Sequence, residues 1–168
     1  MRIPLLPMIT WPLIIVVSLA LLAVAAGQLG WLQGTPPADL GVREGRLKPP
    51  SNTENSVSSQ AALYPDHPQR QYADIAPLAV QGNGAATLAR IKMIVQGTAG
   101  AEVIKSDADY LYARFATRWM RFVDDVEFWF DPVNGVIHVR SASRVGRKDF
   151  GVNRERIEAV RAALAATP

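Results

Sequence analysis

Hydrophobic positions divide the chain into three stretches with different patterns. Residues 1–33 are almost continuously apolar, and no charged residue occurs from Ile3 to Leu32. Residues 34–78 contain seven prolines and keep neither a period of 2 nor a period of 3.6. From 79 to 168 apolar residues recur with helical spacing, then alternate, then recur with helical spacing again. The pattern predicts a membrane-type segment, an extended connection and one folded domain.

Two helices are predicted in the folded domain. The first covers about 84–97, with Leu88, Ile91 and Val95 on one face, and it is opened by Asn83 or Gly84 and closed by Gly97. The second covers 153–166, is capped by Asn153, and has its own apolar face. That face consists of Ile157, Val160 and Leu164.

Between these helices the alternating stretches predict four strands. They lie at 102–106, 110–117, 121–130 and 136–143. Sequential strands with short connections favour antiparallel pairing. The fold class is therefore α+β: an N-terminal transmembrane helix, then an antiparallel four-stranded sheet with two helices packed on one face.

The pair Asn134-Gly135 predicts the register of the last two strands. Asn-Gly favours a two-residue type I′ turn, which would pair Val133 with Val136. In that register Phe130 faces Val139, Phe128 faces Ser141 and Val126 faces Ser143, so one side of the sheet is largely apolar. On the other side Asp131 faces His138, Trp129 faces Arg140, Glu127 faces Ala142 and Asp125 faces Arg144.

The non-apolar side of the sheet carries the candidate ligand- or partner-binding residues. They are Tyr110, Tyr112, Arg114, Trp129, Arg140 and Arg144. Arginines bind carboxylate or phosphate through paired hydrogen bonds, and aromatic rings supply stacking area. The alternative is a lattice of cross-strand ion pairs with Asp125 and Glu127, covered by the segment that follows the membrane helix.

The N-terminal segment 1–33 is interpreted as a transmembrane anchor or, alternatively, a cleaved signal peptide. Trp11 and Trp31 are separated by about 30 Å of helix, which matches a bilayer core, and regular helix is expected from near Trp11. Residues 13–22 would also serve as a signal core, with Ala23-Val24-Ala25 as the cleavage site.

The basic residues on either side of this segment predict its orientation. Arg2 precedes the span, and the first basic residue after it is Arg43. This order favours a single-pass protein of the inner (cytoplasmic) membrane, with its N-terminus inside and its domain on the periplasmic side. The connection 34–78 is predicted to be a Pro-rich linker or a segment laid across the domain, and "SNTENSVSSQ" within it is interpreted as a flexible spacer.

Composition excludes several chemistries. The chain has no cysteine, so it has neither a disulfide nor a thiolate, and its two histidines, His67 and His138, lack ligand spacing for a metal. No metal or other cofactor is therefore expected. The net charge of +3 is too small to indicate a nucleic-acid partner.

The basic stretch 136–156 is predicted to divide into three parts. Arg140 and Arg144 belong to a strand, while Arg147 and Lys148 belong to an exposed connection, where anionic lipid head groups are an alternative to plain solvation. Arg154 belongs to the last helix, where it is spaced to pair with Glu158.

Three blocks carry a family resemblance: "LGVREGRLKPP", "NSVSSQA" and "RFVDDVEFWFDPVNGVIHVRSASRVGRKDFGVNRERIEAVR". Over about Leu40 to Leu164 the chain resembles the bacterial and plastid family called domain of unknown function 1499 (DUF1499). The resemblance implies an envelope or lumenal protein with a signal or membrane segment, and it implies no established activity.

One departure from that family concerns two cysteines. Relatives have a cysteine motif that ends in Asn-Cys before Val-Ser-Ser-Gln, whereas this chain has Pro50 and Ser56 at the matching places. The joint loss of both residues suits a disulfide in relatives better than two unrelated thiols. A loop this short would contribute roughly 2 kcal/mol in the chain-entropy model.

Two functions from different classes follow. The first is a non-catalytic binding or accessory protein of the envelope, with an envelope protein or a small anionic ligand as its partner. The second is an envelope enzyme in which Asp125 and Glu127, with Asp124 nearby, supply acid and base groups beside Arg140 and Arg144. No phosphate loop or nucleophile motif accompanies these carboxylates, so the binding function is favoured.

Overall fold

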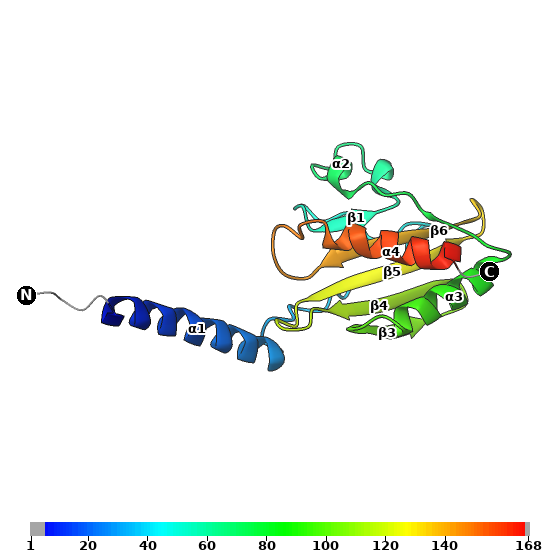
Figure 1. Cartoon of the computed structure of the whole chain (residues 1–168). Helices are drawn as coiled ribbons and strands as arrows, with labels where there is room; N and C mark the ends of the chain where they lie inside the picture. The colour runs from blue at the N-terminus through cyan, green and yellow to red at the C-terminus, as the bar shows by residue number, and fades with distance from the viewer. Residues whose placement is uncertain (1–5, 167–168) are drawn as a thin grey trace, which may run out of the picture.

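A long N-terminal helix extends from one end of an α+β domain in the computed structural model, which describes residues 6–166 (Figure 1). Helix α1 spans Leu6–Gln28 with Pro12 inside it, so regular helix begins earlier than the expected start near Trp11. Arg2, which contributes to the orientation argument, lies outside the described residues.

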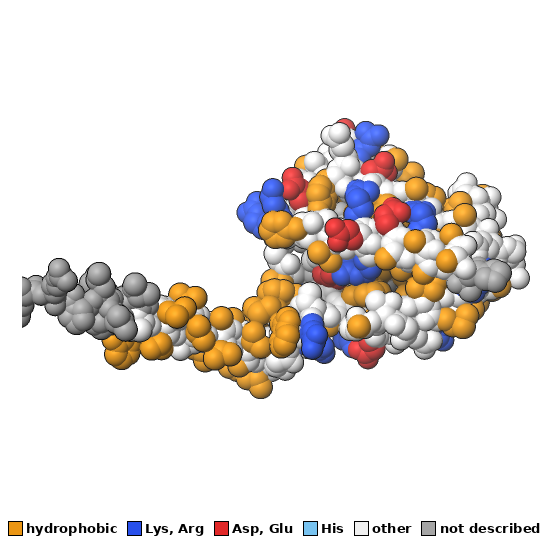
Figure 2. Space-filling model, viewed as in Figure 1, with side chains coloured by type: hydrophobic (Ala, Val, Ile, Leu, Met, Phe, Trp, Pro, Cys, Tyr) orange, Lys and Arg blue, Asp and Glu red, His pale blue; other side chains and the backbone are white. Residues whose placement is uncertain are grey.

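The composition of α1 suits a membrane. Its stretch Thr10–Gln28 has a mean hydropathy of 2.2, only 6% of it is buried, and its side chains are mostly hydrophobic and exposed (Figure 2). By length and composition this helix is able to cross a bilayer, and a signal sequence near an N-terminus has the same properties. Both interpretations of segment 1–33 therefore agree with α1.

The domain is built on an antiparallel sheet. Its strands are β1 (Ser56–Ser58), β2 (Leu78–Ala79), β3 (Ala101–Ser106), β4 (Tyr110–Ala116), β5 (Val123–Asp131) and β6 (Val136–Ser143). The order is β1-β6-β5-β4-β3, and β2 also pairs with β6. The α+β class is confirmed, but the prediction of four strands is wrong, since the described residues form six.

Helices α3 (Gly84–Gln96) and α4 (Val152–Ala166) cover one face of the sheet, as Figure 1 shows. The apolar residues predicted on them are buried, as are those of the facing strands. The core comprises Leu88, Ile91, Val95, Leu111, Phe128, Ile137, Val139, Ile157, Val160 and Leu164, among others. With α1 and the short α2 (Arg70–Ala73), residues 6–166 contain four α-helices.

The predicted register of β5 and β6 is wrong by two residues. Phe128 pairs with Val139 and Glu127 pairs with Arg140, because the chain turns through four residues, 132–135, instead of two. The carboxylate of Asp131 stabilises this longer turn by accepting hydrogen bonds from the backbone of Val133 and the side chain of Asn134. Because side chains alternate with period 2, a shift of two leaves every residue on its predicted face.

The prediction of a flexible spacer at "SNTENSVSSQ" is wrong, because part of this stretch is an ordered strand. Residues Ser56–Ser58 form β1, which extends the sheet beyond β6, and Ser56 and Ser58 are fully buried. This strand escapes a pattern search because it is only three residues long and lacks alternation. The pairing with β6 is a tertiary contact.

The start of α4 differs from the predicted Asn153 cap. Asn153 lies inside the helix, and the carboxylate of Asp149 accepts hydrogen bonds from the backbone N–H groups of Gly151 and Asn153. Asp149 also accepts hydrogen bonds from Tyr72 and from the side chain of Asn153. Burial opposes ionisation of Asp149, but these hydrogen bonds outweigh it and lower the pKa of the carboxyl.

Candidate functional site

The face of the sheet opposite α3 and α4, called here the polar face, carries the residues that the alternation placed there. Residues Tyr110 and Tyr112 project from β4, Asp125 and Glu127 from β5, and Arg140 from β6. Arg144 follows the end of β6 and reaches back to Asp125. The structure therefore joins four charged side chains into two neighbouring ion pairs.

The first pair, Asp125 with Arg144, is fully engaged. The Nε of Arg144 donates to Oδ2 of Asp125 at 2.8 Å, and Nη2 donates to Oδ1 at 2.7 Å. Tyr112 donates its hydroxyl to Oδ1 at 2.5 Å. Hydrogen bonding to Asp125 raises the pKa of Arg144, and burial together with Asp125 raises the pKa of Tyr112 to about 12.

The second pair, Glu127 with Arg140, is incomplete. The Oε1 of Glu127 accepts hydrogen bonds from the Tyr110 hydroxyl and the Gly41 backbone, both at 2.7 Å. Its Oε2 is buried, accepts no hydrogen bond from a described residue, and lies 3.7 Å from Nη1 of Arg140. Within residues 6–166 the one hydrogen bond of this guanidinium runs from Nε to the Pro49 carbonyl at 3.3 Å.

Burial disfavours the charged form of both members of this second pair. Glu127 is 0% exposed, and desolvation raises the pKa of its carboxyl despite the hydrogen bonds from Tyr110 and Gly41. Desolvation lowers the pKa of Arg140 against the attraction of Glu127 and Asp125. In each case a dry environment disfavours the charged form.

Residues 34–52, called here the covering segment, lie over the polar face. Leu47 is buried against Tyr110 and Trp129, and the Gly41 and Pro49 backbones contact Glu127 and Arg140 as above. Beside these contacts a pocket of about 340 Å³ remains open, the polar-face pocket. Its polar lining comprises Thr35, Lys48, Ser51, Asn52, Asp125, Arg140, Ser143 and Arg144.

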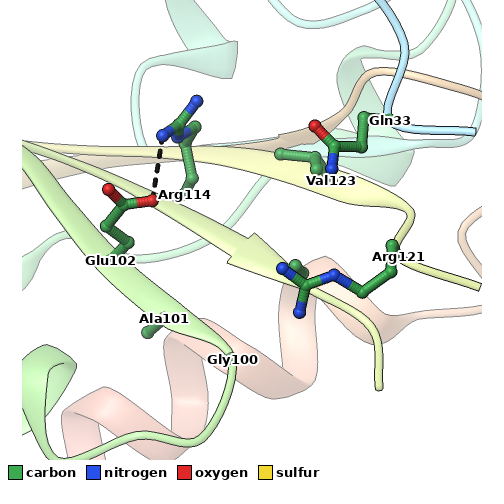
Figure 3. Close-up of a pocket in the computed structure, with 8 residues that line it drawn as sticks. Gln33, Gly100, Ala101, Glu102, Arg114, Arg121 and Val123 are labelled. Atoms are coloured by element: carbon green, nitrogen blue, oxygen red, sulfur yellow. Dashed lines mark hydrogen bonds and ion pairs between the residues drawn. The ribbon is translucent and has the colours of Figure 1, made fainter. Parts of the chain in front are cut away.

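Of the six predicted binding residues, only Arg140 and Arg144 line this pocket. Trp129 is buried beneath the covering segment and stacks on His138 with ring centroids 5.4 Å apart. Arg114 projects toward the opposite edge of the sheet, where Nη2 donates to Glu102 at 2.9 Å. There it lines a separate pocket of about 270 Å³ with Arg121 and Gln33 (Figure 3).

The carboxylates proposed for catalysis are already engaged. Asp125 is held by Arg144 and Tyr112, Glu127 is fully buried, and Asp124 projects from the other face to Arg156. An acid or base must reach its substrate. Of these three carboxylates only Asp125 lines the polar-face pocket, and both of its oxygens accept hydrogen bonds from Arg144. In the described part of the chain, His, Asp and Glu form no group of three that could hold a metal ion.

The basic stretch 136–156 is divided by the fold. The predicted pairing of Arg154 with Glu158 is wrong: Arg154 donates to the carbonyls of Tyr72 and Asp74, and Glu158 pairs with Arg161. Lys148 pairs with Glu54 at 2.9 Å.

Sequence reasoning missed Lys48, Ser51 and Asn52 in the pocket, because they belong to a segment without periodicity. The available signal was the position of the family blocks. Residues 40–50 and 55–61 already resembled the family, although neither stretch has a helix or strand pattern.

The fold and the site together define the class of protein. It is an α+β domain with two arginine–carboxylate ion pairs on one face of its sheet. Its own N-terminal segment covers that face, and an apolar helix precedes this segment. Comparison of the sequence with protein families shows a match, over residues 46–164, to the family described as "Protein of unknown function (DUF1499)". The chain belongs to this family, as its sequence blocks predicted. Comparisons with curated proteins and with solved structures gave no match.

Proposed function

We propose that this chain is a non-catalytic, membrane-tethered protein of the cell envelope whose domain binds a small oxyanion, a carboxylate or a phosphate, in the polar-face pocket. Helix α1 supports the tether through its length and hydropathy. The basic residues support an N-terminus in the cytoplasm and a periplasmic domain. Arg2 precedes the span, whereas the first basic residue after it, Arg43, comes more than ten residues later.

The observation that carries the binding proposal is the sparse hydrogen bonding of Arg140, whose carboxylate partner Glu127 lies 3.7 Å away. A guanidinium has five N–H donors, and this one is 4% exposed with a single long hydrogen bond. A buried charge with free donors is costly unless a partner satisfies it. An oxyanion in the polar-face pocket would accept those hydrogen bonds.

The charges around the pocket favour an anion over a neutral ligand. Lys48, Arg140 and Arg144 line it, and Asp125 is the acid in the lining. The carboxylates that pair with the first two cations, Asp39 at 2.6 Å from Lys48 and Glu127 at 3.7 Å from Arg140, do not line the pocket. A space of about 340 Å³ suits a small molecule and is too small for a protein segment of any length. This size favours a ligand over the alternative of an envelope protein bound at the same place.

The test is calorimetric titration of the full chain in detergent with inorganic phosphate and, separately, with succinate. Binding by one of the two identifies the oxyanion class. Replacing Arg140 removes a charge-assisted hydrogen bond worth about 1.5–3 kcal/mol, so we expect the affinity to fall at least about tenfold. Arg43→Gln, which changes an exposed arginine outside the pocket, is the matched control and should bind as wild type does.

Arg140→Gln alone leaves Glu127 buried without its cation, so the informative variant is Glu127→Gln/Arg140→Gln, which removes both charges. The single variant Glu127→Gln should bind the anion more tightly than wild type, because Arg140 is then no longer shared. If neither anion binds the wild type, or if the double variant binds as well as wild type, the proposal is wrong.

A further inference from the structure

The end of the domain from which α1 extends is formed by two loops, residues 117–122 and 144–150. The first is fixed to α1 directly: Nε2 of Gln28, the last residue of the helix, donates to the carbonyls of Arg118 and Trp119 at 3.1 and 2.9 Å. A Cβ on Gly27 would lie 2.5 Å from the Met120 carbonyl oxygen. Loop 117–122 therefore lies at the level where α1 ends.

The second loop lies next to the first. A Cβ on Gly34 would meet Val145 and Arg144 within 2.8 Å, so the chain leaving α1 also passes closely over loop 144–150. A cavity of about 290 Å³ separates the two loops, and Phe122, Val145 and Phe150 line it. The two loops and this cavity form one surface, called here the proximal end.

The proximal end exposes large apolar side chains. Phe150 is 89% exposed and Trp119 is 60% exposed, while Trp31, just after α1, is 76% exposed. Figure 2 shows hydrophobic side chains gathered where α1 meets the domain. Exposed apolar groups that cluster in this way mark interaction surfaces, and exposed tryptophan is typical of the membrane interface.

Every exposed charge in these two loops is positive. The exposed or half-exposed cations are Arg118, Arg121, Arg147 and Lys148. The other charged residues, Arg144 and Asp149, are held inside the fold by Asp125 and by the start of α4. Lys148 has a neighbouring acid, Glu54, outside the loops. A surface of this kind attracts acidic head groups.

Two residues of the proximal end adopt backbone conformations that side chains avoid. Phe150 has a φ of 54° and Arg121 a φ of 56°. A bulky aromatic residue in the left-handed region is strained, and such strain concentrates at functional positions. At Phe150 the strained backbone presents an aromatic ring to the outside, which packing within the domain does not require.

We propose that the proximal end rests on the surface of the anionic bilayer that α1 enters, with Trp119 and Phe150 in the interfacial layer and the four cations against acidic lipid head groups. This inference rests on the proposed tether. The contact between Gln28 and loop 117–122 favours a bilayer over a protein partner, because a spanning α1 places its last residue, and thus this loop, at the lipid surface.

The experiment uses the full chain, which contains no cysteine, so a single introduced cysteine can be labelled with a nitroxide. Val145→Cys probes the proximal end. Val133→Cys is the matched control: Val133 is 90% exposed and lies in the turn between β5 and β6, at the opposite end of that hairpin. Each labelled protein is reconstituted into vesicles of phosphatidylcholine with phosphatidylglycerol, and its accessibility to oxygen and to a water-soluble nickel chelate is measured.

We expect the label at 145 to show a several-fold higher oxygen-to-nickel accessibility ratio than the label at 133. The ratio at 145 should fall in pure phosphatidylcholine, in high salt, and in the variant Arg147→Gln/Lys148→Gln, because each weakens the electrostatic contribution. Phe150→Ser should lower it in every lipid.

Two results would overturn the proposal while leaving the tether intact. In one, the chain remains in the vesicles after a carbonate wash but residue 145 is as accessible to nickel as residue 133. In the other, spin–spin broadening at 145 reveals a second copy as the neighbour. Loss of the chain from the vesicles in that wash would instead contradict the tether itself, and this inference with it. The calorimetric titration of the chain with phosphate or succinate, which tests the proposed ligand site at Arg140, is independent of all three outcomes.

Discussion

Two arginine–carboxylate pairs lie side by side on the polar face, and they differ in how completely they are satisfied. Asp125 and Arg144 share two hydrogen bonds of 2.8 and 2.7 Å, with Tyr112 as a third partner. Glu127 and Arg140 approach only to 3.7 Å, and Oε2 of Glu127 accepts no hydrogen bond from a described residue. The chemical groups are the same, so the difference comes from geometry.

The geometry follows from the position of each arginine's backbone in the sheet relative to its carboxylate partner. Arg140 stands directly opposite Glu127 in the sheet, which leaves its long side chain little room to bend into a two-bond contact. Arg144 follows the end of β6 and lies diagonal to Asp125 instead of opposite it, so its side chain spans the longer gap and meets the carboxylate with two donors. A buried pair stabilises a fold only when its remaining donors and acceptors are satisfied. The first pair thus serves stability, and the second has donors left for a ligand.

The largest expected effect is on the satisfied pair. Arg144→Gln leaves the Asp125 carboxylate buried without its cation, which should lower the free energy of unfolding by about 3–5 kcal/mol. Urea unfolding of the detergent-solubilised chain, followed by tryptophan fluorescence, measures this. The matched control Arg147→Gln, at an exposed arginine, should stay within about 0.5 kcal/mol of wild type. Equal effects of the two variants would show that Arg144 adds no stability.

A smaller effect separates the two pairs when both partners are removed. Glu127→Gln/Arg140→Gln should change the free energy of unfolding by less than about 1 kcal/mol, because the two members share only one weak ion contact and glutamine keeps an oxygen that accepts the hydrogen bonds from Tyr110 and Gly41. Asp125→Asn/Arg144→Gln should cost about 2 kcal/mol, since three hydrogen bonds to charged groups are lost. The same urea unfolding compares them. The reverse order would contradict the distinction between the pairs.

The smallest expected effect is a pH dependence specific to Glu127. Its folded-state pKa is raised by burial above the ordinary value of 4.5, so the folded state holds this proton more tightly than the unfolded state does. The resulting stabilisation is fully present below the unfolded pKa and is lost as the pH rises through the folded pKa. The stability of wild type relative to Glu127→Gln should therefore decline as the pH is raised through this range. Unfolding curves of both proteins over a pH series measure the difference, and an increase with pH would contradict the assignment.

Much of the fold was predictable from local pattern. The helices predicted at 84–97 and 153–166 each differ from α3 and α4 by one residue, because caps and apolar spacing are local properties. The assignment of Glu127 and Phe128 to opposite faces also held, since alternation determines it. What failed was the turn: Asn134-Gly135 favours two residues, but the hydrogen bonds accepted by Asp131 stabilise four.

The candidate site was predictable only in part. Alternation placed Arg140 on the polar face, but Trp129, expected to be a binding residue, is buried under Leu47. The covering segment has no periodicity, so the sequence could not show that Lys48 lies beside Arg140. That proximity results from contacts between residues about ninety positions apart in the chain, such as Arg140 Nε with the Pro49 carbonyl.

The sequence by itself determined the apolar N-terminal helix, the α+β class, the face on which each strand residue lies, and the family. These properties depend on composition, on periods of 2 and 3.6, and on contiguous motifs. The tertiary structure decided the strand register, the addition of β1 and β2 to the sheet, and the unequal satisfaction of Arg140 and Arg144. These depend on distances between residues remote in sequence, and those distances are determined only when the covering segment and the short strands pack against the sheet.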